Sequence, residues 1–168
     1  MTGKALILAA AIAVVGLGPR AAADDLPVYR GPAEVIGPAM LSLNGKHIIL
    51  FGIDAPVKGQ PCYAGSRAWD CSAASAKTLL NIVGTQDVAC EQRRVDRYGR
   101  VFAVCKAGGA DINRTLVEAG MAVALPKETT DYVAVEAAAK AKGVGIWRGP
   151  FTAPADYRAM LAGHPQER

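Results

Sequence analysis

The stretch EVIGPAMLSLNGKHIILFGIDAPV, residues 34–57, decides the fold. Strand-forming residues fill Ala33 to Ile36 and Met40 to Leu43, and Asn44-Gly45 between strands is the strongest short signal for a tight hairpin turn. A third strand follows from His47 to Ile53 and runs into an irregular loop. The folded region therefore begins with three consecutive strands.

The rest of the chain adds two strands and three helices. The later elements are a helix from about Cys71 to Val83, a strand hairpin from Val88 to Lys106, a short helix between Asp111 and Gly120, and a helix from about Thr130 to Lys142. One face of the first helix is apolar and consists of Ala73, Ala76, Leu79, Leu80 and Val83. This order predicts an α+β fold, a small twisted barrel with helices packed outside it.

The N-terminal residues have the pattern of a secretory signal peptide. Lys4 precedes an apolar run from Ala5 to Leu17, and small residues before Asp24 predict cleavage after Ala23. The run is shorter than the roughly 20 residues that a membrane span needs, so the mature protein is predicted to be exported, periplasmic or secreted, with no membrane segment.

The predicted mature chain carries little excess charge. The full sequence has 19 Lys and Arg against 15 Asp and Glu, and removal of Lys4 and Arg20 leaves a net charge of +2. This balance neither requires nor excludes binding to nucleic acid.

All four cysteines lie in the mature part, and an even number in an exported chain predicts two disulfides. Three pairings are open. A hairpin that turns at Arg97-Tyr98 places Cys90 opposite Cys105, which favours this bridge together with Cys62 to Cys71. Each would stabilise the fold by roughly 2–3 kcal/mol in the chain-entropy model. The alternative, a zinc site, lacks the close Cys or His spacing that zinc needs.

The stretch from Glu34 to Val57 and the DRYGR run from Asp96 to Arg100 together resemble the staphylococcal nuclease, or thermonuclease, family. The resemblance covers Ala33 to Trp147 and implies that family's five-stranded OB-type β-barrel with three α-helices packed outside. The predicted organisation is a signal peptide (1–23), a short lead (24–32), a thermonuclease-like domain (33–150) and a C-terminal tail (151–168).

The family is known to cleave phosphodiesters with a calcium ion held by two aspartates, a glutamate base and two arginines. When the motifs are matched one position at a time, the first aspartate falls on Ala39, the first arginine on Ile49 and the glutamate on Val57. The second aspartate is matched by Asp54 and the second arginine by Arg100. Two of the five charged groups are therefore retained.

These replacements remove most of the chemistry that the resemblance implies. One aspartate makes a weak calcium site, because Ca²⁺ takes six to eight oxygen ligands. Val57 cannot accept a proton, and loss of a base typically costs about 10²- to 10⁴-fold in rate. Ile49 cannot stabilise an oxyanion, which costs on the order of another 10²-fold. We expect no cofactor, and calcium only if the chain is an active nuclease after all.

The retained residues have a structural and a functional interpretation. In the first, Asp54 accepts loop N–H groups and pairs with Arg100 across the barrel face. In the second, Arg97, Tyr98 and Arg100 form a small phosphate-binding site, since the family's matching residues contact nucleotide phosphates. The segment GMAVALPKE (residues 120–128) has no Tyr or Trp, so the side chain expected to stack on a base is missing.

The sequence thus predicts an exported, monomeric, disulfide-bonded protein of thermonuclease fold that lacks calcium-dependent phosphodiesterase activity. It would act as a binding or accessory module with weak affinity for nucleic acid or another anionic polymer. Two alternatives stay open: an active secreted Ca²⁺-dependent nuclease with an altered site, and an accessory protein in exopolysaccharide (succinoglycan) production, with which some exported bacterial relatives are associated.

Overall fold

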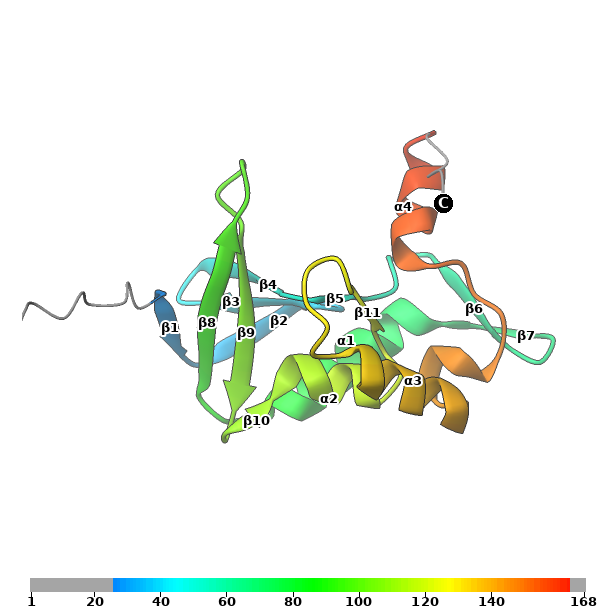
Figure 1. Ribbon diagram of the computed structural model, residues 1–168, viewed down its shortest axis with the longest axis horizontal. Coiled ribbons are helices and arrows are strands. Elements are labelled where there is room, and N and C mark those ends of the chain that lie inside the picture. Colours follow the sequence, from blue (N-terminus) through cyan, green and yellow to red (C-terminus); the bar gives the residue numbers. More distant parts are fainter. Residues whose placement is uncertain (1–25, 164–168) are drawn as a thin grey trace, which may run out of the picture.

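The computed structural model describes residues 26–163, so the predicted signal peptide lies outside the described part. That part is an α+β fold in which a curled sheet lies beside a layer of helices (Figure 1). The strands are β1 (Val28–Gly31), β2 (Ala33–Gly37), β3 (Met40–Leu43), β4 (Lys46–Leu50), β5 (Ile53–Asp54), β6 (Pro61–Ala64), β7 (Arg67–Asp70), β8 (Val88–Val95), β9 (Val101–Ala107), β10 (Ala110–Asp111) and β11 (Val123–Ala124). The helices are α1 (Cys71–Val83), α2 (Ile112–Glu118), α3 (Val133–Lys142), the 3-10 helix η1 (Gly145–Arg148) and α4 (Pro154–Leu161).

The main sheet has the order β1-β8-β9-β4-β3-β2, with β10 paired to β9. Its two outer strands, β1 and β2, are separated in sequence only by Pro32, so one bent segment pairs with β8 at one end and with β3 at the other. Proline has no N–H to donate, which suits a break in the ladder. The sheet is curled back on itself through this segment, and strand β1 lies in the predicted short lead (24–32), for which no strand was predicted.

The first hairpin forms as predicted. Asn44 and Gly45 both have positive φ, 50° and 77°, and they join β3 to β4 with Leu43 opposite Lys46. Alternate residues of these strands, Leu41, Leu43, Ile48 and Leu50, are buried in the core. The predicted third strand is in fact two, because the chain bends at Gly52 (φ 76°) and β5 pairs with β11 instead.

The second hairpin, β8–β9, carries the predicted disulfide. Cys90 lies opposite Cys105 in the antiparallel register, and the two are bonded, as are Cys62 and Cys71. Both predicted pairings are confirmed. A bulge between Gln92 and Arg94 shifts the register by one residue toward the turn, which the sequence analysis did not anticipate.

Helices α1, α2 and α3 pack in sequence order, α1 on α2 and α2 on α3, and α2 also contacts β9. The predicted apolar face of α1 is partly wrong, since Leu80 is 56% exposed and Ser75 is fully buried in its stead. The Ser75 hydroxyl donates to the carbonyl of Met121 (2.9 Å) and lies 3.1 Å from that of Pro38. A small polar residue is accommodated here because carbonyls from two neighbouring segments reach it.

A β-hairpin and a fourth α-helix are further additions to the prediction. The loop that follows Pro56 contains a short hairpin, β6–β7, with Cys62 opposite Trp69. The C-terminal tail forms a fourth helix, α4, with Pro154 at its first turn, a position that suits proline because the N–H there has no helical partner. Among residues 26–163, no helix combines the length and apolar character needed to cross a membrane.

Candidate functional site

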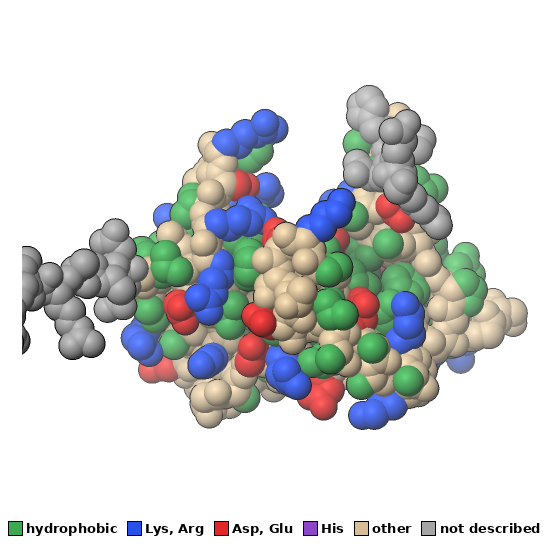
Figure 2. Space-filling view, viewed as in Figure 1, with side chains coloured by type: hydrophobic (Ala, Val, Ile, Leu, Met, Phe, Trp, Pro, Cys, Tyr) green, Lys and Arg blue, Asp and Glu red, His purple; other side chains and the backbone are tan. Residues whose placement is uncertain are grey.

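A cleft of about 490 Å³ opens between the tip of the β8–β9 hairpin and helix α4. Figure 2 shows it as a hollow between two projections, with Lys and Arg side chains on both sides. The lining residues come from the turn before β3, from β4, β5 and the loop after it, from the hairpin, from the loop after β11, and from α4: Gly37, Pro38, Ala39, Met40, Ile49, Ile53, Asp54, Ala55, Pro56, Val57, Lys58, Arg94, Arg100, Phe102, Leu125, Glu128 and Arg158.

The cleft contains all five positions matched to the family's charged groups. Ala39, Ile49 and Val57 contribute apolar surface to it, and Asp54 and Arg100 line the same space. The fold thus brings these residues together, although they are up to 61 positions apart in sequence. What lines the cleft is a mainly apolar floor rather than a set of carboxylates.

Asp54 is held by a residue that the sequence analysis did not single out. Arg158 on α4 donates from Nη1 to Oδ1 (2.9 Å) and from Nη2 to Oδ2 of Asp54. The predicted pair of Asp54 with Arg100 is therefore wrong. The prediction failed because α4, which carries the actual partner, lies in the C-terminal tail, for which no helix was predicted.

Arg100 pairs instead with Asp96, across the turn of its own hairpin. Its Nε donates to Oδ2 of Asp96 (2.6 Å), and the backbone N–H groups of Tyr98 and Arg100 donate to Oδ1 at 2.9 and 3.0 Å. Burial raises the pKa of Asp96, but these hydrogen bonds and the Arg100 charge outweigh it and hold the pKa below its usual range. The local pair is favoured because both groups lie within one tight turn.

Arg97 and Tyr98 lie at the exposed tip of the hairpin and do not line the cleft. Arg97 donates to the Tyr98 hydroxyl (2.6 Å), and its guanidinium lies 4.7 Å from the centre of the Tyr98 ring. Of the three residues predicted to bind phosphate, Arg100 alone reaches the cleft. The phosphate-binding role of this group stays a prediction.

Two further charged residues of the cleft escaped the sequence analysis. Arg94 donates to Oε1 of Glu128 (2.5 Å) and covers the ring of Phe102 at 3.4 Å from its centre. The other oxygen of Glu128 accepts the N–H of Gly52 at 3.0 Å. No local pattern marks Glu128, since its partners lie 34 and 76 residues away. Pro154 followed by Asp156 is a helix-start signal that could have revealed α4 and hence Arg158.

The three ion pairs of the cleft share one pattern of exposure. In each, the guanidinium is more exposed than its carboxylate: 49% against 14% for Arg158–Asp54, 52% against 14% for Arg100–Asp96, and 39% against 21% for Arg94–Glu128. In each pair the arginine is therefore the more accessible partner. A molecule entering the cleft meets mainly positive groups that are already held in place.

The residues present do not fit a calcium ion. Both oxygens of Asp54 are occupied by Arg158, and the position matched to the family's first aspartate is Ala39. Within residues 26–163, no group of three or more His, Cys, Asp or Glu side chains is arranged to hold a metal. A divalent cation at Asp54 would also have to displace a guanidinium that already neutralises the carboxylate.

Comparison with known proteins agrees with the resemblance to the staphylococcal nuclease family. The family model described as "Staphylococcal nuclease homologue" matches residues 47–149. Two curated relatives are each 34% identical to this chain. The match to the succinoglycan biosynthesis protein ExoI of Rhizobium meliloti extends over 122 residues, which are 70% of this chain and 64% of that protein. The match to an uncharacterized endonuclease of Haemophilus influenzae extends over 97 residues, which are 56% of this chain and 49% of that protein. The chain thus spans less than two thirds of the length of one relative and about half of the other. With its strand order, its disulfide-bonded hairpin and this match over more than half of its length, the chain belongs to the staphylococcal nuclease homologue family.

Proposed function

We propose that this protein is a non-catalytic member of the nuclease family that binds an anionic ligand in the cleft. The observation that carries the proposal is the replacement of the catalytic charges: Asp54 is bound by Arg158, and Ala39, Ile49 and Val57 line the cleft with apolar side chains. Phosphodiester hydrolysis by the family mechanism needs a base and charge stabilisation, and these residue types supply neither.

The ligand class follows from the surface that the cleft presents. Three arginines and Lys58 line it, and each arginine is more exposed than the carboxylate with which it pairs. Arginines that are already oriented lose less side-chain entropy when an anion binds, which favours binding. Phe102 is covered by Arg94, and Leu125 lies in the wall after β11, so the cleft offers little aromatic surface for nucleic-acid bases.

A second candidate function is a role in exopolysaccharide production. The longer of the two curated matches is to a protein named for succinoglycan biosynthesis. Each arginine of the cleft is already paired with a carboxylate, so the positive charge in excess is small. Such a cleft suits an acidic polysaccharide with widely spaced charges better than a nucleic acid with a charge on every nucleotide.

Export is part of the proposal. Two disulfides stabilise the fold, and disulfides persist in oxidising compartments outside the cytoplasm. The charged and then apolar N-terminal sequence has the pattern of a signal peptide.

The test is the release of acid-soluble nucleotides from denatured DNA by the oxidised mature protein, with millimolar calcium or with a chelator. A calcium-dependent nuclease of the family serves as positive control. We expect no release above the chelator control and no calcium binding by isothermal titration calorimetry. Calcium-dependent release that Arg100→Ala abolishes would overturn the proposal in favour of an active nuclease. Retention on an acidic polysaccharide column but not on a DNA column would favour the exopolysaccharide role.

A further inference from the structure

The guanidinium of Arg158 lies on Asp54, the residue that the family resemblance matches to a metal ligand. Asp54, the residue matched to a calcium ligand, receives two hydrogen bonds from Arg158, which is 104 positions away in sequence. Arg158 lies outside residues 47–149, which match the family model. Its position in the cleft is therefore a feature that the family match does not account for.

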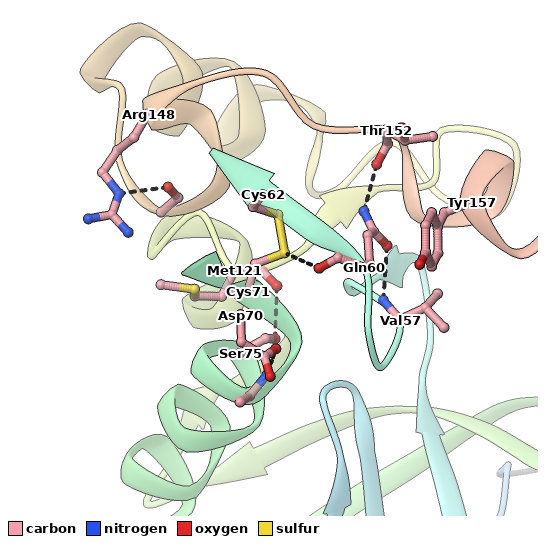
Figure 3. Close-up of a disulfide and its surroundings, with 12 residues drawn as sticks. Val57, Gln60, Cys62, Asp70, Cys71, Ser75, Met121, Arg148, Thr152 and Tyr157 are labelled. Atoms are coloured by element: carbon pink, nitrogen blue, oxygen red, sulfur yellow. Dashed lines mark hydrogen bonds between the residues drawn. A yellow bond between two sulfur atoms is a disulfide. The ribbon is translucent and has the colours of Figure 1, made fainter. Parts of the chain in front are cut away.

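Helix α4 is attached to the cleft at several points besides this ion pair. Gln60, which is buried, donates through Nε2 to the carbonyl of Thr152 (2.7 Å) and accepts the N–H of Val57 through Oε1 (3.0 Å), as Figure 3 shows. The Tyr157 hydroxyl donates to the carbonyl of Gly59 (3.0 Å). These contacts join the loop after β5 to the start of α4, so the helix is a wall of the cleft.

We propose that Arg158 takes the place of the metal ion and that the cleft binds an oxyanion, a carboxylate or a phosphate group, directly on this guanidinium and without a divalent cation. The inference rests on the proposed function, because it takes the cleft to be non-catalytic. A guanidinium has five N–H donors, and the pair with Asp54 uses one from each terminal nitrogen, which leaves the others for a ligand. Arg158 is half exposed and lines the cleft, so these donors are accessible.

The chemistry of the pair favours an oxyanion over a neutral ligand. The planar fork of arginine matches the oxygen atoms of carboxylate and phosphate, and a paired carboxylate fixes its orientation. Lys58 forms no ion pair within the described part of the chain and adds a second positive charge to the lining of the cleft. An ion pair this exposed contributes little to stability, so holding the fold together does not by itself account for it.

The test is a titration of the oxidised mature protein with sodium phosphate and, separately, with sodium glucuronate, followed by NMR chemical shifts in chelator and again in calcium. We expect saturable binding of at least one probe in chelator, unchanged by calcium, with shifts in the loop after β5 and in α4. Arg158→Ala should weaken it by about tenfold or more, the value of one charge-assisted contact, and Arg158→Lys by less. The tighter of the two probes tells whether the natural ligand carries phosphate or carboxylate.

The matched control is Arg67→Ala, which removes an exposed arginine on β7, outside the cleft, and should leave the affinity unchanged. Thermal unfolding of each variant checks that it is folded. Equal affinity in folded Arg158→Ala and in the unchanged protein would overturn the inference, as would binding that requires calcium or saturable binding of neither probe. Nucleotide release with calcium would instead refute the proposed function, so the two failures are distinguishable.

Discussion

At the scale of single residues, Gln60 shows how one buried side chain shapes the cleft. It is 1% exposed, and its amide joins the N–H of Val57 to the carbonyl of Thr152. A buried amide is costly unless its donor and acceptor are both satisfied, and here the partners come from two segments 95 residues apart. Together with the Tyr157 hydrogen bond and the Arg158–Asp54 pair, this residue holds α4 in position.

Gln60→Ala should therefore destabilise the protein by about 2–4 kcal/mol, because it removes two hydrogen bonds and leaves two partly buried backbone groups without their partner. The free energy of unfolding in urea measures the effect. Gln86→Ala, at an exposed glutamine in the turn before β8, is the control and should change stability by less than about 0.5 kcal/mol. Similar values for both variants would show that the Gln60 hydrogen bonds have little energetic weight.

At the scale of secondary structure, the tip of the β8–β9 hairpin is organised by a single carboxylate. Asp96 accepts two backbone N–H groups of the turn and the side chain of Arg100. These donors stabilise the ionised form and keep the pKa of Asp96 below the usual carboxyl value of 3.8. The hairpin tip is thus most stable with Asp96 charged.

The sign of the pH dependence follows from this shift. A pKa that is lower in the folded than in the unfolded state adds stability above the unfolded value of 3.8, and this contribution is lost as the pH falls through the folded value. Asp96→Asn should reduce stability at pH 7 and should flatten the fall in stability below about pH 4. Urea midpoints between pH 7 and pH 2 test this.

Asp87→Asn, at an exposed aspartate in the turn before β8, controls for the loss of one negative charge. It should leave the steepness of the acid limb close to that of the unchanged protein. If Asp96→Asn and Asp87→Asn had the same pH profile, the hydrogen bonds at Asp96 would not be the cause.

At the scale of the whole molecule, the cleft depends on the ends of two projecting elements. The β8–β9 hairpin contributes Arg94 and Arg100, and α4 contributes Arg158 from the other side (Figure 1). The floor between them comes from β4, β5 and the loop after β5. At the position that the family resemblance assigns to a metal ligand, Asp54 is paired with Arg158 of α4, so the C-terminal tail as well as the motif shapes this site.

This arrangement predicts that restoring the family's charges in the motif alone is insufficient. The variant Ala39→Asp/Ile49→Arg/Val57→Glu should bind calcium weakly, because Arg158 still occupies Asp54. Addition of Arg158→Ala frees both oxygens of Asp54 and should raise the calcium affinity by about tenfold or more. Isothermal titration calorimetry measures both variants, with circular dichroism as a check of folding. Equal calcium affinity with and without Arg158 would contradict the prediction.

Much of the fold could be predicted from local sequence. Asn44-Gly45 determined the first hairpin because these residues tolerate positive φ, and the opposed spacing of Cys90 and Cys105 determined the second disulfide. The limits of α1, Cys71 to Val83, were predicted correctly, since capping and periodicity are properties of neighbouring residues. The buried face of α1 was less predictable, because Ser75 is buried by carbonyls from elsewhere in the chain.

The sequence by itself determined which side chains the cleft lacks. Ala39, Ile49 and Val57 are apolar whatever the fold does, and an apolar side chain can neither bind calcium nor accept a proton. The tertiary structure alone decided which charges meet: Arg158 with Asp54, and Arg94 with Glu128. Partners so distant in sequence are brought together by the packing of whole helices and strands, and no local pattern of residue types predicts which of them meet.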